Sequence, residues 1–117
     1  MRVVAALILL TLFLVWLQYV AAAEARPADF RAESTAYCLT GRMSDGSYTR
    51  LRSAASNRHP LGTKIRVTSR RPGPLGLRRF VIRDRIGYGS ELDFWTPSCS
   101  YALNRYGRRV VTYRLGW

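Results

Sequence analysis

The N-terminal segment constrains the fold of this chain most, because it determines how much chain is left to fold and in which compartment. A positively charged start is followed by an apolar run over residues 3–20 and by alanines at 21–23. This order is typical of a secretory signal peptide, with cleavage expected before Glu24. The apolar run is also long enough to cross a membrane, so an uncleaved anchor remains the alternative.

Removal of residues 1–23 leaves 94 of the 117 residues, which is enough for one domain with one modest core. Residues 24–30 predict a flexible linker and residues 31–117 the folded domain. Arg2 is the only basic residue lost with the leader, so the formal charge falls from +12 to +11. An arginine-rich surface favours polyanionic partners, and export makes the cell wall their natural source.

Cys38 and Cys99 are the only two cysteines, and both belong to the exported part. An oxidising compartment and a small domain favour a disulfide between them, with two buried free thiols as the alternative. On the chain-entropy model such a bond contributes about 4 kcal/mol. No metal site is expected, because His59 is the only histidine that could join the two thiols.

Short strands separated by turns dominate the exported part. Residues 64–69 and 109–115 both alternate polar and apolar side chains, which indicates half-buried strands. Ser98 can cap the start of a helix and Gly107 can end it. This pattern in so short a chain favours a small all-β barrel over a sandwich. The predicted elements are strands at 33–39, 64–69, 79–83 and 109–115 and one short α-helix at 98–106.

The stretch RDRIGYGSELDFW at 83–95 contains the best candidates for chemistry. Asp84 follows an apolar strand, Asp93 precedes two aromatic residues, and a glycine-rich turn separates the two aspartates. Burial beside aromatic rings raises the pKa of a carboxyl group, which is what a general acid needs. The alternative is that both aspartates are turn or cap residues with arginine partners.

Several other polar and aromatic side chains are candidates for sugar binding, with core or turn roles as the alternative for each. His59 lies in a turn, where a surface position is expected rather than a catalytic role. Asp45 precedes a glycine and is expected to be a turn residue. The candidates for substrate binding are Tyr37, Tyr88 and Trp95 as stacking rings and Asn57 as a hydrogen-bonding group.

Five motifs follow one another along the exported part: STAYC at 34–38, GRMSDG at 41–46, HPLGT at 59–63, the stretch at 83–95 and ALNRYGRR at 102–109. In this order they resemble the 3D domain, a family named for three aspartates. That family is grouped with RlpA-like proteins and with the catalytic barrel of the lytic transglycosylase MltA among the double-psi β-barrels. The resemblance spans residues 34–115, nearly the whole exported part.

The resemblance implies a six-stranded double-psi β-barrel that acts on peptidoglycan. In active members an aspartate protonates the bond between N-acetylmuramic acid and N-acetylglucosamine, and the muramyl 6-hydroxyl then closes on the anomeric carbon. Asp93 resembles the aspartate of the family's Arg-x-Asp-x-Phe/Trp strand and is the expected general acid/base. Asp84 resembles the aspartate that opens the family's Asp-Thr-Gly-Gly turn, and it would orient the site or stabilise positive charge.

Two departures from the family pattern bear on activity. The turn between the two aspartates is shorter than the family's usual form. The third aspartate is expected just before Pro-Leu-Gly-Thr, but residues 55–57 read Ala-Ser-Asn. Loss of one acid leaves catalysis feasible if Asp93 donates the proton, because the substrate supplies its own nucleophile.

Three functions therefore remain open: a secreted lytic transglycosylase, a non-catalytic peptidoglycan-binding or wall-loosening barrel, and a secreted basic binder of nucleic acid or anionic surfaces. No RNA-binding aromatic motif supports the third. We expect a monomer without cofactor or metal that binds peptidoglycan glycan strands and no specific nucleic acid. Contact with the membrane is expected only if the leader is not cleaved.

Overall fold

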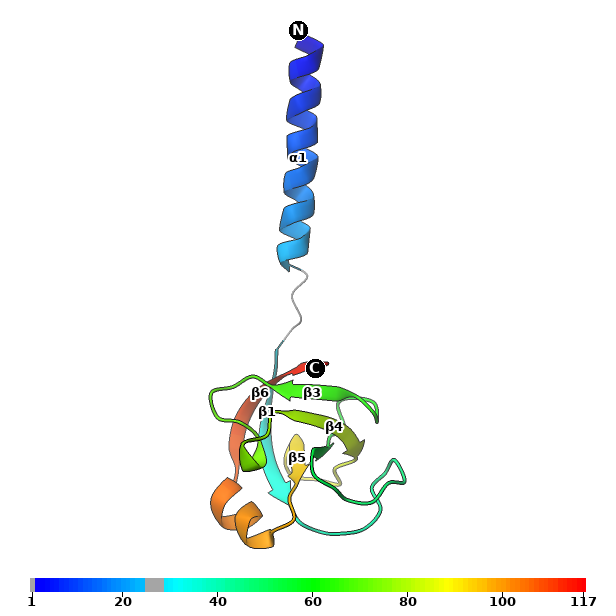
Figure 1. Ribbon diagram of the computed structural model, residues 1–117, viewed down its shortest axis with the longest axis vertical. Coiled ribbons are helices and arrows are strands. Elements are labelled where there is room, and N and C mark those ends of the chain that lie inside the picture. The colour runs from blue at the N-terminus through cyan, green and yellow to red at the C-terminus, as the bar shows by residue number, and fades with distance from the viewer. Residues whose placement is uncertain (1, 25–28) are drawn as a thin grey trace.

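The computed structural model describes residues 2–24 and 29–117 (Figure 1). One helix, α1 (Arg2–Glu24), precedes the domain. Its window Arg2–Tyr19 is apolar and long enough to cross a membrane, and none of that window is buried against the rest of the chain. An apolar N-terminal helix of this kind fits a signal peptide as well as an anchor. Most of the predicted linker, residues 25–28, lies outside the described residues.

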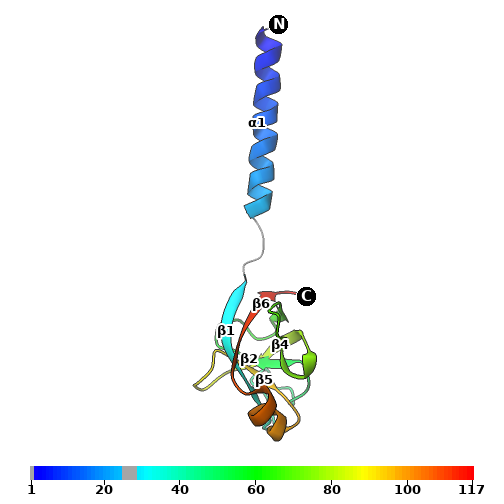
Figure 2. The same cartoon turned by 90° about the vertical axis from the view of Figure 1, so that its left-hand side faces the viewer.

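The domain is mostly sheet, as the alternating patterns predict, and has six strands. Their order is β1-β5-β2-β4-β3-β6, and β6 also pairs with β1, so the sheet closes on itself. β1 runs parallel to β5 and β2 parallel to β4, while the other pairs are antiparallel. Figures 1 and 2 both show β1 and β6 side by side. The strands are β1 (Phe30–Tyr37), β2 (Ser53–Ala55), β3 (Lys64–Val67), β4 (Arg79–Asp84), β5 (Leu92–Trp95) and β6 (Arg109–Leu115).

The inner face of this sheet forms the hydrophobic core. Because side chains alternate along a strand, every second residue points inward. Phe80 and Phe94 meet at the centre, with ring centroids 4.4 Å apart. The fully or nearly fully buried core residues are Ala32, Ala54, Ile65, Val67, Phe80, Ile82, Leu92, Phe94, Tyr106, Val111 and Tyr113.

The helix predicted at 98–106 has a different geometry from the α-helix expected. Two helical residues at 99–100 lead into the π-helix η2 (Tyr101–Tyr106), so the turn is wider than in an α-helix. The capping residues are as predicted: Ser98 Oγ accepts the backbone N–H of Tyr101 at 3.2 Å, and Gly107 ends the helix with φ 61°. The end of η2 is fixed to β1, because the hydroxyl of Tyr106 lies 2.6 Å from that of Ser34.

The predicted disulfide is present: Cys38 and Cys99 are bonded, with their Cα atoms 5.0 Å apart. It joins the end of β1 to the start of the segment that becomes η2. This bond and the apolar N-terminal helix are both typical of a protein that acts outside the cytoplasm.

The expectation that His59 lies on the surface is wrong. Its side chain is only 7% exposed, because the ring packs edge-on against Phe30 of β1 and Tyr113 of β6. His59 Nε2 lies 2.7 Å from the hydroxyl of Tyr113. Burial lowers the pKa of His59, and the nearby Arg58 guanidinium lowers it further. His59 is therefore a buried residue that packs between β1 and β6 and hydrogen-bonds to Tyr113.

Candidate functional site

Asp84 and Asp93 lie in one row across the outer face of the sheet. Asp93 of β5 is paired with Thr35 of β1 on one side and with Ala55 of β2 on the other. Ala55 is in turn paired with Asp84 of β4. The two carboxylates therefore flank Ala55 from neighbouring strands, with their backbones about 10 Å apart.

A register shift in the pairing of β2 with β4 places Asp84 on this face. Ala54 pairs with Ile82, but the next residue, Ala55, pairs with Asp84, so Arg83 is skipped. Phe80 and Ile82 point inward, and strict alternation would turn Asp84 inward as well. Such a bulge reorients the side chain that follows it, and here it puts Asp84 on the same side as Asp93.

The two aspartates open into a pocket of about 390 Å³. The floor is formed by the strand residues, and two loops form the walls. Tyr88 at the rim is 96% exposed, so its ring is free to meet a ligand. The lining residues are Tyr37, Leu39, Thr40, Gly41, Arg42, Thr49, Ala55, Asp84, Arg85, Ile86, Gly87, Tyr88 and Asp93.

Asp93 has the electrostatic environment of a general acid. Burial, together with the nearby negative charge of Asp84, raises its pKa from 3.8 to about 6. The hydroxyl of Thr35 opposes this shift by donating a hydrogen bond of 3.0 Å to Oδ1. A carboxyl group with a pKa of about 6 is protonated about half of the time at pH 6 and about a tenth of the time at pH 7, whereas an ordinary aspartate is almost never protonated at either pH.

Asp84 is held in place by several donors. Its Oδ1 accepts hydrogen bonds from the backbone N–H and hydroxyl of Ser44, at 3.0 and 2.7 Å, and from the backbone N–H of Arg85 at 2.9 Å. Its Oδ2 accepts the hydroxyl of Tyr37 at 3.4 Å. Asp84 thus fixes the position of the 41–48 loop and of one tyrosine, and it contributes negative charge to the pocket.

Tyr37 remains a neutral hydrogen-bond donor beside Asp84. Burial raises the pKa of its phenol, and the negative charges of Asp84 and Asp93 raise it further. Its hydroxyl can therefore donate a hydrogen bond but does not act as a base near neutral pH. Tyr37, which the sequence predicts as a sugar-stacking ring, lines the pocket, and its hydroxyl points to Asp84.

Two of the predicted ligand-binding residues, Trp95 and Asn57, lie outside this pocket and hydrogen-bond to backbone groups. Trp95 does not line the pocket; its indole N–H donates to the carbonyl of Leu39 at 2.9 Å and so supports the pocket wall. Asn57 also lies outside the pocket. Its amide donates to the carbonyl of Ile86 at 2.7 Å and accepts the N–H of the same residue at 3.0 Å, which uses both of its polar ends.

Sequence reasoning missed two residues that organise the site. Thr35 touches Asp93 directly and also lies 2.7 Å from the hydroxyl of Ser90. Arg85 reaches across the turn and donates to the carbonyls of Ser56 and His59. Alternation along β1 could have found Thr35, because Ala32 and Ser34 point inward. The role of Arg85 depends on backbone carbonyls and leaves no side-chain pattern.

Comparison of the chain with protein-family models, with curated proteins and with solved structures finds no match. Within residues 2–24 and 29–117, no three histidine, cysteine or acidic side chains form a group that could hold a metal ion. The pocket residues offer acid/base chemistry through the Asp93 carboxyl group with its raised pKa, the Asp84 carboxylate and the neutral phenol of Tyr37.

Proposed function

We propose that the chain acts on peptidoglycan outside the cytoplasm and cleaves the MurNAc–GlcNAc bond as a lytic transglycosylase, with Asp93 as general acid/base. The observation that carries this proposal is the raised pKa of Asp93, about 6, in an open pocket that also contains Asp84. The resemblance to the 3D domain supplies the substrate class.

The reaction needs one acid/base and no water. The Asp93 carboxyl group gives its proton to the glycosidic oxygen as the bond from that oxygen to the anomeric carbon of the muramyl residue breaks. The carboxylate left behind then takes the proton of the muramyl 6-hydroxyl as O6 bonds to the anomeric carbon. The products are a shortened glycan with a free 4-hydroxyl and a 1,6-anhydromuramyl end. Asp93 returns to its protonated form.

Asp84 and Tyr37 would assist without transferring a proton. The positive charge that develops at the anomeric carbon is favoured by a nearby carboxylate, and Asp84 provides one that hydrogen bonds hold in place. Tyr37 and the exposed ring of Tyr88 offer surfaces on which sugar rings can pack.

We also propose that the closed sheet is a double-psi β-barrel and that α1 is a signal peptide. The first proposal is supported by six strands with two parallel pairs, β1 with β5 and β2 with β4. The second is supported by the apolar composition of α1 and by the disulfide. Cleavage before Glu24 would give a secreted protein.

A non-catalytic peptidoglycan-binding barrel is the second candidate, and one observation favours it. Ala55 occupies the position directly between Asp84 and Asp93, in the segment where the family's third aspartate is expected. A pocket with one acid fewer could hold glycan without cleaving it.

Mass spectrometry of purified peptidoglycan after incubation with residues 24–117 tests the two candidates. The enzyme proposal predicts anhydromuropeptides from the wild type and a loss of about 100- to 10,000-fold with Asp93→Asn, because asparagine cannot donate a carboxylic proton. Asp84→Asn should have a milder effect. Full activity of Asp93→Asn would assign the acid to another residue. Binding to the glycan without product from the wild type would favour the binding module.

A further inference from the structure

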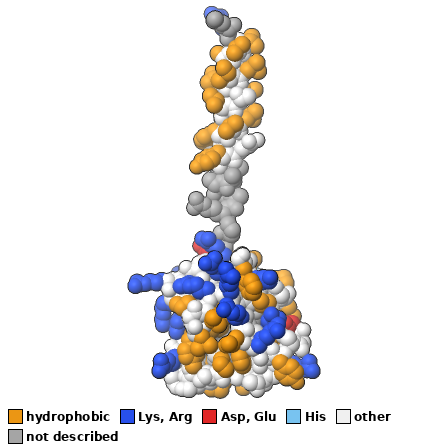
Figure 3. Space-filling view, viewed as in Figure 1, with side chains coloured by type: hydrophobic (Ala, Val, Ile, Leu, Met, Phe, Trp, Pro, Cys, Tyr) orange, Lys and Arg blue, Asp and Glu red, His pale blue; other side chains and the backbone are white. Residues whose placement is uncertain are grey.

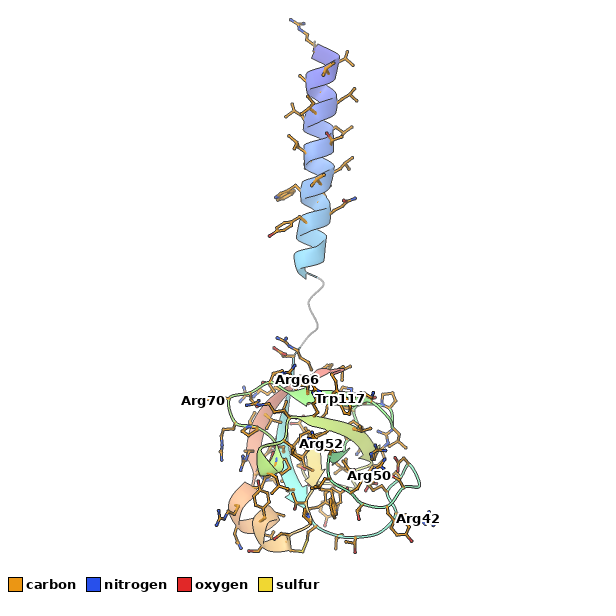
Figure 4. The ribbon with its side chains drawn as sticks, in the orientation of Figure 1. Arg42, Arg50, Arg52, Arg66, Arg70 and Trp117 are labelled. Carbon is orange, nitrogen blue, oxygen red and sulfur yellow. A yellow bond between two sulfur atoms is a disulfide. The ribbon has the colours of Figure 1, made fainter. Side chains whose placement is uncertain are left out.

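A second cavity has a volume of about 630 Å³ and lies apart from the aspartate pocket. Neither Asp84 nor Asp93 lines it. We call it the basic cleft. Figure 3 shows lysine and arginine side chains gathered on the end of the domain that faces the leader, and Figure 4 shows Arg66, Arg70 and Trp117 there. The lining residues that the argument uses are Arg66, Arg70, Arg114, Leu115 and Trp117.

Three arginines stand side by side on neighbouring strands at this end. Arg66 of β3 is paired with Arg114 of β6 on one side and with Arg79 of β4 on the other. Like charges directly opposite each other destabilise a sheet, so this row lowers the stability of the fold unless an anion lies over it. Among the described residues, Asp29 provides the one acidic contact, with Arg114 at 2.6 Å.

The basic cleft also has an apolar edge. Trp117 is 51% exposed, and its ring is held in place because its indole N–H donates to the carbonyl of Ile65 at 3.1 Å. The ammonium group of Lys64 lies 4.7 Å from the ring centroid. Leu115 is exposed beside it. Cationic side chains around an exposed tryptophan are typical of surfaces that bind the headgroup region of a membrane.

The cleft lies at the end of the domain where the chain arrives from α1. Phe30, the first residue of β1, pairs with Tyr113, which also pairs with Val67 beside the cleft. From Glu24 to Phe30 the chain can span at most about 20 Å. While α1 is in a membrane, the cleft therefore stays close to the lipid headgroups.

We propose that the basic cleft docks onto an anionic phospholipid surface, with the headgroup phosphates lying over the arginine row and Trp117 entering the headgroup region. Docking through this end would also orient the domain. β1 runs from Phe30 at the cleft to Tyr37 in the aspartate pocket, a distance of about 20 Å. The pocket would then face away from the membrane.

Vesicle binding by residues 24–117 tests the proposal, and this segment is a complete folding unit. The core contains residues of the domain alone, and the described side chains of α1 are exposed. We expect binding to vesicles that contain phosphatidylglycerol, weak binding to pure phosphatidylcholine vesicles, and release as salt rises. Equal binding to both kinds of vesicle would overturn the proposal.

Two matched double variants distinguish vesicle binding through the cleft from an effect of the total charge of the protein. Arg66→Gln with Arg70→Gln removes two exposed cleft arginines and should weaken partitioning about 30-fold, since each basic group near an anionic surface contributes roughly fivefold. Arg50→Gln with Arg105→Gln removes the same charge from exposed positions outside the cleft and should change binding less than about twofold. An equal loss in both pairs would contradict a specific docking face.

Trp117 gives an independent readout of orientation. Residues 24–117 contain two tryptophans, and Trp95 is nearly buried. Brominated lipids should therefore quench the fluorescence of the wild type, and Trp117→Phe should remove that quenching. A different outcome would overturn the proposal: the wild type fails to bind vesicles but binds purified cell walls, and Arg66→Gln with Arg70→Gln weakens that binding. This outcome would assign the cleft to a wall polymer. Neither result depends on glycan cleavage.

Discussion

Replacing Asp93 by asparagine should stabilise the fold at pH 8 and have little effect at pH 4. The pKa of Asp93 is raised in the folded protein, from 3.8 to about 6, so folding makes ionisation of this group less favourable. Its contribution to stability is therefore fully present below pH 3.8 and is lost as pH rises through about 6. Asparagine carries no charge at any of these pH values and can still accept the hydroxyl of Thr35.

The magnitude follows from the size of the shift. A change of about two pKa units corresponds to at most about 3 kcal/mol. The carboxyl group faces an open pocket, and solvent screening reduces this to about 1–2 kcal/mol in the free energy of unfolding. For a domain of this size the Tm of Asp93→Asn at pH 8 should rise by roughly 5–10 °C.

Urea and thermal unfolding of the oxidised protein at pH 4 and pH 8 measure this difference. Asp45→Asn is the matched control, because hydrogen bonds from Ser47 lower the pKa of Asp45 and the sign is reversed. That variant should be less stable than the wild type at pH 8, and the difference should disappear only as pH falls below 3.8. If Asp93→Asn differs from the wild type equally at both pH values, Asp93 does not have the raised pKa on which its proposed catalytic role depends.

Two further predictions concern the fold. Replacing Cys38 and Cys99 together by alanine should lower the free energy of unfolding by about 4 kcal/mol in urea titrations. Reduction of the wild type should give a similar loss. Unchanged stability would show that the disulfide does not constrain the unfolded chain. Gly73→Ala should cost about 1–3 kcal/mol, because its new methyl group would lie 2.7 Å from the buried ring of Phe80. Gly87→Ala, which meets no atom within 4 Å, is the control, and equal loss in both would refute the steric argument.

The strands with clear alternation were predictable from sequence. β6 (Arg109–Leu115) has the predicted bounds, and β3 and β4 differ by one or two residues at their ends. β2 was missed because Ser53–Ala55 are three small residues that are all buried, so no alternation is visible. β1 begins before the predicted strand, because Phe30 stacks on Tyr113 at 5.4 Å, a contact between residues far apart in sequence.

The candidate site was partly predictable. The sequence singled out Asp84, which follows an apolar strand, and Asp93, which precedes two aromatic residues, and both line one pocket. What the pattern could not provide was the register shift beside Ala55, which turns Asp84 outward. Asn57 and Trp95 carry side chains that bind sugar in many proteins, but here their polar atoms are bonded to backbone groups. Only the folded chain shows which polar groups remain available.

The placement of β1 between the last two strands has a consequence for how the chain folds. Phe30–Tyr37 pairs only with β5 and β6, so its partners begin at Leu92 and Arg109. While the chain is being synthesised from its N-terminus, β1 has neither partner, and the sheet cannot close until β6 is available. Pairing over such long sequence separations is slow, because the entropy of loop closure must be overcome first. A chain built this way completes its sheet only after its last strand, β6, has been made.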